Sequence, residues 1–379
     1  MSDPSLRDLA NDYVLDLVPY EPGKPVDDVA RELGLAPEQV IKLASNENPL
    51  GPSPKAVAAM QEAVANCHFY PDGGGFHLRN ALAEKFGLER ANVVLGNGSN
   101  EILELLFKGF TRPGAASIVT NENAFAVYEL MAQLFGLDCL KAADGPGFAP
   151  DINAMLAAVR ADTRLVFLAS PNNPTGTRSS NEDIDRLVHG VPPHVIVCLD
   201  EAYYEFLDDA PDTLAYLREG RRVVLIRTFS KIQGLAGLRI GYGLTTTEIA
   251  DVLQRSRQPF NANLIAQVGA LAALADTEHM DRTKAVTLEG RERLRAAFEE
   301  MGLEQIPSEA NFILVRVGDG DAVFQALLRR GIIVRSMKSY RQPEFIRVSI
   351  GTPEQMERFI RELPAALEAA GVGPTAAAS

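Results

Sequence analysis

The stretch Val195-Ile196-Val197-Cys198-Leu199-Asp200-Glu201-Ala202-Tyr203 joins five successive apolar residues to an abruptly polar segment. An apolar run of this kind is typical of a strand that is buried on both faces, as in a parallel sheet covered by helices. In open sheets of this class, ligands bind beyond the carboxyl ends of the strands. Asp200 and Tyr203, which follow the apolar run, are therefore candidates for a functional site.

Four further β-rich runs alternate with helical segments along the chain. The helical segments include Glu101–Phe110 and Asn153–Arg160, and another helix is predicted to begin at Pro54, with Ser53 as its N-cap. This alternation predicts an α/β fold in which helices cover a mostly parallel sheet. The further strands are expected at Val93–Leu95, Ser117–Thr120, Leu165–Ala169 and Val223–Thr228.

The chain of 379 residues is longer than one compact core usually holds, so a smaller second domain is expected. A helical stretch from about residue 262 includes the charged run Glu289 to Glu300, and three predicted strands follow it. This order indicates an α+β domain. The strands are expected at Phe312–Val315, Ile332–Val334 and Phe345–Ile350. We predict an N-terminal arm (1–45), a large domain (46–265), a small domain (266–370) and a frayed tail (371–379).

Charge and cysteine content restrict the partners and the compartment. The formal net charge of −13 disfavours binding to nucleic acid or to an anionic membrane surface. Cys67, Cys139 and Cys198 form no CxxC pair, and the five histidines share no ligand spacing, so neither a disulfide framework nor a metal site is expected. With no apolar leader and no apolar run of membrane-spanning length, a cytoplasmic location is expected.

Three polar segments follow predicted neighbouring strands and should meet at one edge of the sheet. They contain Asn173, Asp200 with Tyr203, and Ser230 with Lys231. Taken singly, a turn, a helix cap or a solvated lysine would explain each of them. Together they match the needs of pyridoxal 5'-phosphate: a lysine for a Schiff base, an acid for the pyridine nitrogen, and donors for the phenolic oxygen. Lys231 would form the Schiff base, and Asp200 would pair with the pyridine nitrogen. The donors to the phenolic oxygen would be Asn173 and Tyr203.

A second group of residues would bind the cofactor phosphate. The segment Gly96-Asn97-Gly98-Ser99-Asn100-Glu101 leads from a predicted strand directly into a helix. The backbone amides at a helix N-terminus bind phosphate, and Ser230 and Arg239 would add a hydroxyl and a guanidinium. A glycine-rich turn alone is usually structural, so its position before a helix is what favours Gly98, Ser99 and Asn100 as ligands.

These motifs resemble those of the fold type I aminotransferases: Asn-Asn-Pro-Thr-Gly at 172–176, Asp-Glu-Ala-Tyr at 200–203, Ser-Lys at 230–231 and Leu-Arg-Ile-Gly-Tyr at 238–242. Within that class, the chain is similar to the histidinol-phosphate aminotransferases over nearly its full length. The similar segments are Val18-Pro19-Tyr20-Glu21-Pro22-Gly23, Leu43-Ala44-Ser45-Asn46-Glu47-Asn48-Pro49, Tyr70-Pro71-Asp72 and Ile346-Arg347-Val348-Ser349-Ile350-Gly351-Thr352.

The resemblance implies a homodimer with shared active sites. Phe125 would stack on the pyridine ring, and Tyr70 would reach the cofactor phosphate of the neighbouring subunit. The N-terminal arm would pack with the small domain and the partner. Lys231, once substrate has displaced it, would move the proton from the substrate Cα to the cofactor as general base and acid.

The resemblance also implies that Arg347 holds the acidic end of the substrate, either the phosphate of histidinol phosphate or the α-carboxylate of glutamate. Tyr20 and Arg335 would assist with the phosphate, and Asn46 would belong to the substrate site. The alternative for both arginines is a position on the surface of small-domain strands.

Three segments depart from the family pattern and bear on substrate choice. They are Gly73-Gly74-Gly75, Met337-Lys338-Ser339-Tyr340-Arg341, and Ile232-Gln233, where a small and an aromatic residue are common in the family. An aminotransferase for aromatic or other amino acids therefore remains an alternative. A pyridoxal-phosphate decarboxylase or lyase is another, because the cofactor residues alone do not fix which Cα bond breaks. A cofactor-binding module fused to a DNA-binding domain is disfavoured, because the arm is short and acidic.

Overall fold

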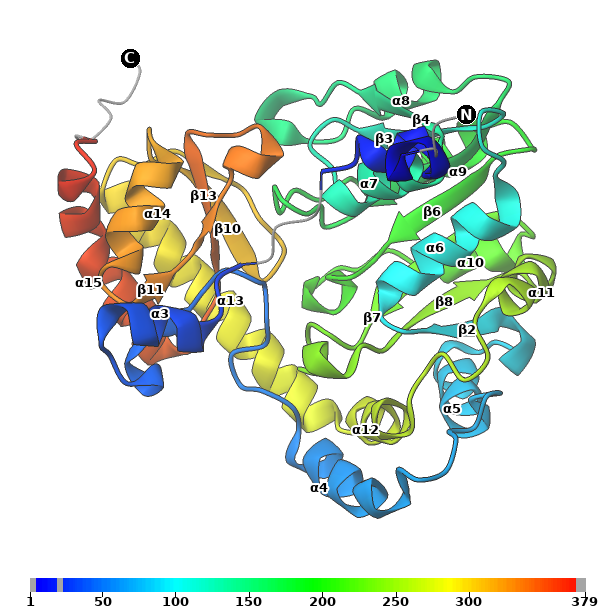
Figure 1. Cartoon of the computed structure of the whole chain (residues 1–379), viewed down its shortest axis with the longest axis horizontal. Coiled ribbons are helices and arrows are strands. Elements are labelled where there is room, and N and C mark those ends of the chain that lie inside the picture. The colour runs from blue at the N-terminus through cyan, green and yellow to red at the C-terminus, as the bar shows by residue number, and fades with distance from the viewer. Residues whose placement is uncertain (1–4, 19–22, 373–379) are drawn as a thin grey trace.

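The computed structural model describes residues 5–18 and 23–372, and it shows two layered units side by side (Figure 1). The larger unit is built on a seven-stranded sheet with the order β2-β8-β7-β6-β5-β3-β4, in which β8 alone runs antiparallel to its neighbours. The predicted α/β class with a mostly parallel sheet is therefore confirmed. The strands are β2 (Val93–Gly96), β3 (Ser117–Asn121), β4 (Asp138–Ala142), β5 (Thr163–Ala169), β6 (Ile196–Asp200), β7 (Val223–Thr228) and β8 (Gly241–Thr245).

Helices cover both faces of this sheet, which explains why its central strands are apolar throughout. One face packs against α6 (Ser99–Phe110), α7 (Ala126–Leu134) and α11 (Thr247–Ser256). The other face carries α5 (Phe76–Phe86), α8 (Ile152–Ala158), α9 (Asn181–Gly190), α10 (Leu214–Arg218), α12 (Leu264–Leu274) and, packed on α12, α4 (Pro54–Ala63). Helix α4 begins at Pro54 as predicted, and the Ser53 hydroxyl accepts a hydrogen bond from the Ala56 amide at 3.0 Å.

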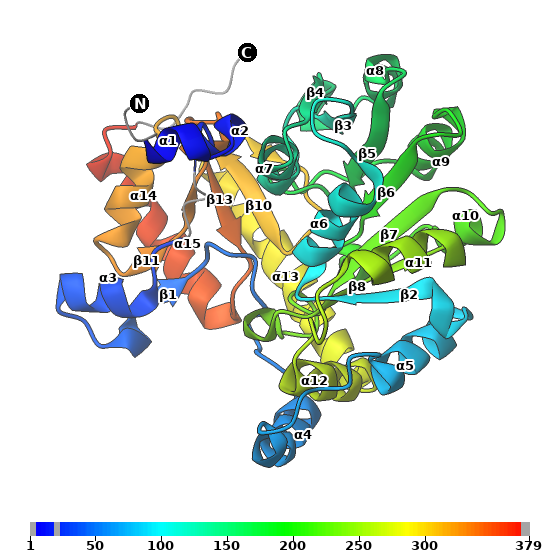
Figure 2. The same ribbon diagram turned by 45° about the vertical axis from the view of Figure 1, so that its right-hand side comes forward.

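The smaller unit is an antiparallel sheet with the order β12-β13-β10-β9, packed against helices (Figure 2). The long helix α13 (Thr277–Glu300) connects it to the larger unit. The remaining elements are β9 (Gln305–Ile306), β10 (Phe312–Arg316), α14 (Gly320–Leu328), β12 (Arg335–Ser336), β13 (Phe345–Ser349) and α15 (Pro353–Ala369).

The N-terminal segment contributes α1 (Leu6–Leu9), α2 (Asp12–Leu15), α3 (Val26–Leu33) and β1 (Ile41–Lys42). Strand β1 pairs in parallel with β11 (Ile332–Ile333), and α3 packs beside this pair against α14. The strand predicted over 332–334 is thus divided, because β11 pairs with β1 whereas the next residues form β12 and pair with β13.

The helical stretch predicted from residue 262 consists of two helices, which are separated at Ala275 and Asp276. Ala266, Ala270 and Ala273 of the first helix, α12, are buried in the core of the larger sheet. The domain division at 45/46 and 265/266 stays a proposal, and the packing of α12 favours a second boundary after that helix. The part of the predicted tail after residue 372 lies outside the described residues.

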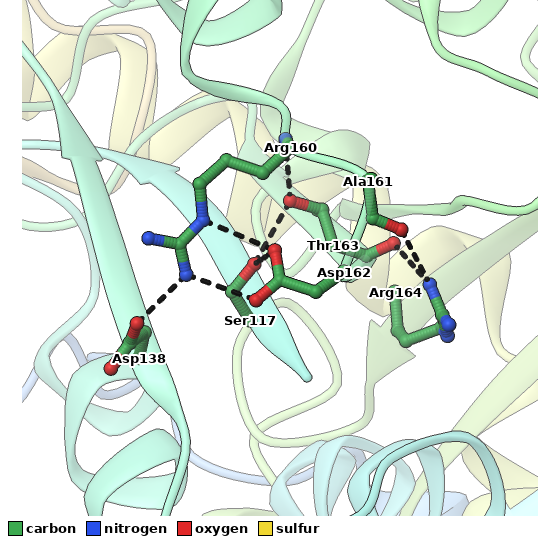
Figure 3. Close-up of polar contacts among 7 residues, drawn as sticks. All are labelled: Ser117, Asp138, Arg160, Ala161, Asp162, Thr163 and Arg164. Atoms are coloured by element: carbon green, nitrogen blue, oxygen red, sulfur yellow. Dashed lines mark hydrogen bonds and ion pairs between the residues drawn. The ribbon is translucent and has the colours of Figure 1, made fainter. Parts of the chain in front are cut away.

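A polar network joins β3, β4 and β5 at their amino ends, opposite the edge where a site is expected (Figure 3). Arg160 donates to Asp138 at 2.7 Å and to Asp162 at 3.1 Å, and the Ser117 hydroxyl donates to Asp162 at 3.1 Å. This network fixes the turn that leads into β5. In the described part of the chain, no helix is long and apolar enough to cross a membrane.

Candidate active site

A cavity of about 290 Å³ lies at the carboxyl ends of the large-sheet strands and is closed from the other side by small-domain residues. It brings together most of the residues that the sequence predicted for one site. The predicted residues that line it are Asn46, Ser99, Asn100, Phe125, Asn173, Asp200, Tyr203, Ser230, Lys231, Arg239, Arg335 and Arg347. Arg347 is 5% exposed, so the alternative of a surface position is wrong for this residue. Arg335 is half-buried, and its role in the site stays a prediction.

Asp200 ends β6 and presents a buried carboxylate to the cavity. One oxygen accepts a hydrogen bond from the Tyr128 hydroxyl at 2.7 Å, and the other accepts from the Ala202 amide at 3.2 Å. Burial raises the pKa of Asp200, and the bond from Tyr128 acts in the opposite direction by stabilising the ionised form. A protonated nitrogen beside this carboxylate would offset its desolvation.

Lys231 projects into the same cavity from the turn after β7. Its Nζ donates to the Ser45 carbonyl at 3.3 Å and lies 5.7 Å from the centre of the Tyr203 ring. Burial, reinforced by the positive charge of Arg347, lowers the pKa of Lys231 to about 8. About a tenth of the amine is then unprotonated at pH 7, far more than for an ordinary lysine, and the unprotonated form is what a nucleophile or general base requires.

Tyr203 is held by a chain of hydrogen bonds that crosses between the two units. Its hydroxyl accepts from Asn46 Nδ2 at 3.0 Å, and Asn46 Oδ1 accepts from the Ser349 hydroxyl at 2.9 Å. All three side chains are buried. Burial raises the pKa of Tyr203 to about 12, so the phenol stays protonated and can donate a hydrogen bond into the cavity.

Arg347 enters the cavity from β13 and is 5% exposed. Its guanidinium donates to Asn173 Oδ1 and, at 3.0 Å, to the Ala44 carbonyl, and it lies over the Phe312 ring. Its Nε is buried without a hydrogen-bond partner in the described residues. Arg335 lies directly opposite in the antiparallel register of β12 and β13, so two arginines enter the cavity from the same part of the small sheet.

The glycine-rich turn before α6 forms a tight cradle around the Arg239 side chain. Gly98 has a φ of +76°, and a Cβ there would lie 2.4 Å from Arg239 Nη2. A Cβ at Gly241 would lie 2.4 Å from the Ser99 backbone nitrogen. Only glycine fits at both positions. The helix N-terminus, the Ser230 hydroxyl and the Arg239 guanidinium are thereby gathered in a form suited to a phosphate group.

Asn123 connects the loop that carries Phe125 to the small domain. Its amide donates to Asp144 at 2.8 Å, its carbonyl accepts from Asn172 at 2.7 Å, and its Oδ1 accepts from Gln342 at 2.8 Å. This network lies beside the cavity and holds the two units against each other there.

Two of the predicted site residues that the structure describes, Gly98 and Tyr70, do not line the cavity. Gly98 acts through the backbone next to Ser99. Tyr70 is 83% exposed and stacks on Phe260 with 4.8 Å between the ring centres. Tyr20 falls outside the described residues.

Sequence reasoning missed Tyr128, Ser349 and Asn123. A usable signal existed only for Tyr128, which lies three residues after Phe125 at the start of a helix and therefore shares its face. The other two act across more than two hundred residues of sequence, which no local pattern reports. Within the described ranges, no group of three or more histidine, cysteine or acidic side chains is arranged to hold a metal ion.

Comparisons with known proteins agree with this site. The model of the family described as aminotransferase class I and II matches residues 38–363. The chain is 49% identical to the histidinol-phosphate aminotransferase of Akkermansia muciniphila, over 95% of this chain and 99% of that protein. It is also 49% identical to histidinol-phosphate aminotransferase 2 of Pseudomonas fluorescens, over 94% and 96% respectively.

Among solved structures, the histidinol-phosphate aminotransferase of Sinorhizobium meliloti, in complex with pyridoxal 5'-phosphate, superposes with a TM-score of 0.86. The two are 26% identical, and the match covers 97% of this chain and 99% of the other.

Proposed function

The chain belongs to the class I and II aminotransferases. We propose that it catalyses the reversible reaction of histidinol phosphate with 2-oxoglutarate, which gives imidazole acetol phosphate and glutamate. Enzymes of this family depend on pyridoxal 5'-phosphate, which supplies an electrophilic carbon and an electron-accepting ring when bound. In histidine biosynthesis, glutamate would be the amino donor.

The cavity fits this cofactor in charge and in shape. Lys231 would carry it, Asp200 would pair with the protonated ring nitrogen, and Asn173 and Tyr203 would donate to the phenolic oxygen. Phe125 would lie against the ring. The phosphate would take the cradle of Gly98, Ser99, Asn100, Ser230 and Arg239, where a Cβ at Gly98 would fill the space that the arginine needs.

Lys231 has a second role in the proposed reaction, because its lowered pKa suits proton transfer near neutral pH. Its Nζ would accept the proton from the substrate Cα and deliver it to the cofactor, and it would carry a proton in the opposite direction in the second half-reaction. The hydrogen bond from Tyr128 favours the ionised form of Asp200, which would keep the ring nitrogen protonated throughout.

The observation that carries the substrate proposal is the cross-strand pair of Arg335 and Arg347. Like charges placed directly opposite each other in a sheet are destabilising, and a single guanidinium is enough for one carboxylate. Two arginines facing one cavity therefore favour an acidic group of higher charge, such as a phosphate monoester. The alternative aromatic substrate offers no group that would use the second arginine.

The proposal is tested by comparing histidinol phosphate with histidinol, which lacks the phosphate. We expect Arg335→Gln to lower kcat/KM for histidinol phosphate about 10- to 100-fold, the scale of a hydrogen bond to a charged group, while the value for histidinol changes little. The matched control is Arg341→Gln, which removes an exposed arginine of the neighbouring loop. An equal loss with both substrates, or faster turnover of phenylalanine than of histidinol phosphate, would contradict the proposal.

A homodimer is proposed on the basis of the exposed aromatic side chains near Tyr70. Phe69, Tyr70, Phe76 and Phe260 are between 46% and 83% exposed on segments that lie close together. Covering them with a second subunit would bury a large apolar area and would bring Tyr70 to the partner's cofactor phosphate. The expected cytoplasmic location stays a prediction.

Subunit complementation tests the shared site directly. Lys231→Ala and Tyr70→Ala are each expected to be impaired alone. A mixed dimer would contain one site with a native Lys231 and a native Tyr70 from opposite subunits, so mixing the two refolded variants should restore activity. No recovery on mixing, with mixed dimers shown to be present, would remove Tyr70 from the partner's site.

A further inference from the structure

A second cavity of about 290 Å³ lies behind the turn that carries Lys231 and shares no lining residue with the active site. It lies in the larger unit, between the 204–210 segment, the end of α5 and the start of α13. Its size is close to the lower limit for small-molecule sites, so it suits a small metabolite. The residues that matter for its chemistry are Phe86, Tyr204, Glu205, Arg227, Gln233 and Tyr242.

The arginine of this cavity is already neutralised. Arg227 Nε donates to Glu201 at 2.8 Å, both side chains are almost fully buried, and the Thr213 hydroxyl donates to the other Glu201 oxygen at 2.6 Å. The guanidinium also stacks 3.8 Å from the centre of the Tyr204 ring. The cavity is therefore not an anion site built on Arg227.

Gln233 is a buried polar side chain with few hydrogen-bond partners. It is 2% exposed, its Oε1 has no hydrogen-bond partner in the described residues, and its Nε2 contacts only the Met280 sulfur at 3.7 Å. An unpartnered buried polar group destabilises the folded state. Gln233 therefore lines the cavity with an amide that a ligand could satisfy.

Five charged side chains line the cavity, and two of them are neutralised by acids outside the lining: Arg227 pairs with Glu201, and Lys284 pairs with Asp208. This leaves Glu205 and Asp281 against Lys85, a small excess of negative charge. Within the described ranges, no side chain forms an ion pair or a hydrogen bond with the Glu205 carboxylate, which lines the cavity. Burial raises the pKa of Glu205. Because Arg227 is paired with Glu201 and Lys284 with Asp208, neither of these cations forms an ion pair with Glu205. A half-buried carboxylate in this position is stabilised by a cationic hydrogen-bond donor.

The other walls define the body of the ligand. Phe86, Tyr204 and Tyr242 supply aromatic surface, and Ile232, Leu274 and Met280 supply apolar surface. Lys85 stands at the exposed mouth. We propose that this cavity binds a small primary ammonium compound with a ring-sized apolar body, the ammonium donating to Glu205 and to Gln233 Oε1. Aromatic amines and aromatic amino acids share this chemistry, and the latter could place a carboxylate near Lys85.

Calorimetry with three probes of one shape tests the proposal: phenethylamine, L-phenylalanine and 3-phenylpropionate. The protein is the holoenzyme with its cofactor fixed to Lys231 by borohydride reduction, so that added amines cannot react there. Phenethylamine is expected to bind, and 3-phenylpropionate is not. Tighter binding of L-phenylalanine that Lys85→Ala reverses would identify an amino acid as the ligand, and equal or weaker binding would identify a simple amine.

Two variants locate the binding. Glu205→Gln keeps the shape and is expected to weaken the amine about tenfold or more, and Gln233→Phe is expected to abolish binding by filling the cavity. Glu38→Gln, which removes an exposed acid of the small-domain side, is the matched control. Thermal unfolding verifies that each variant is folded. The proposal is overturned if neither amine binds at millimolar concentration, or if both variants bind amine as the wild type does.

Discussion

Replacing Tyr128 by phenylalanine should weaken cofactor binding without removing any group that touches the cofactor. The Tyr128 hydroxyl donates to Asp200 at 2.7 Å, and the two side chains are 0% and 6% exposed. A hydrogen bond to a buried charged group contributes about 1.5–3 kcal/mol. Because this bond stabilises the ionised carboxylate, its loss should raise the pKa of Asp200 further.

A carboxylate that is more easily protonated pairs less well with the protonated ring nitrogen. We therefore expect Tyr128→Phe to bind pyridoxal phosphate about 10- to 100-fold more weakly at neutral pH, with part of the loss recovered as the pH rises and Asp200 ionises. Equilibrium dialysis at several pH values measures this dependence.

Tyr216→Phe is the matched control, because Tyr216 is buried in the core of the same domain and forms no hydrogen bond through its hydroxyl in the described part of the chain. It should leave cofactor affinity unchanged. If Tyr128→Phe binds the cofactor with the wild-type affinity and pH profile, Tyr128 does not maintain the charge of Asp200 and the reasoning is refuted.

Three further predictions concern the other side chains of the site. Below pH 8, cofactor-free Lys231→Met should be more stable than the wild type by up to about 3 kcal/mol, because folding lowers the pKa of Lys231 from 10.5 to about 8. Between these two pH values the Lys231 amine is protonated in the unfolded wild-type chain but not in the folded one. Chemical denaturation should therefore show that the difference in free energy of unfolding between Lys231→Met and the wild type shrinks as the pH rises toward 10.5. Arg347→Lys should lower kcat/KM for glutamate and for histidinol phosphate about 100-fold, because the planar guanidinium is lost, and steady-state kinetics measures this effect. If only KM changes, by a small factor that is the same for both substrates, Arg347 does not contact the substrate directly. Gln342→Leu breaks the contact with Asn123 between the two units, so we expect a higher KM with unchanged cofactor affinity, and a variant that loses cofactor instead would place Gln342 in the cofactor site.

The sequence predicted the elements whose patterns are local. The continuous apolar run before Asp200 identified β6, and Ser53 with Pro54 identified the start of α4. The edge strand β4 was missed because Asp138 and Lys141 interrupt its apolar pattern, as edge strands tolerate. The division between α12 and α13 was missed because neither Ala275 nor Asp276 breaks a helix strongly.

For the candidate site, the sequence predicted which residues gather but not the hydrogen bonds that hold them. Polar residues at strand ends gather at one edge in any parallel sheet, and this brought Asn173, Asp200 and Lys231 together. The hydrogen bonds that hold them depend on tertiary packing: Ser349 reaches Tyr203 through Asn46 only because β13 of the small domain lies against the segment around Asn46. No local pattern encodes that contact.

The most direct test of the account is an absorption spectrum of the protein loaded with pyridoxal phosphate, before and after addition of glutamate and, separately, of histidinol phosphate. The account predicts a band from lysine-bound cofactor that both compounds bleach, and that Lys231→Ala lacks. Absence of the band in the wild-type protein with excess cofactor would contradict the assignment of Lys231, and bleaching by glutamate but not by histidinol phosphate would contradict the proposed substrate.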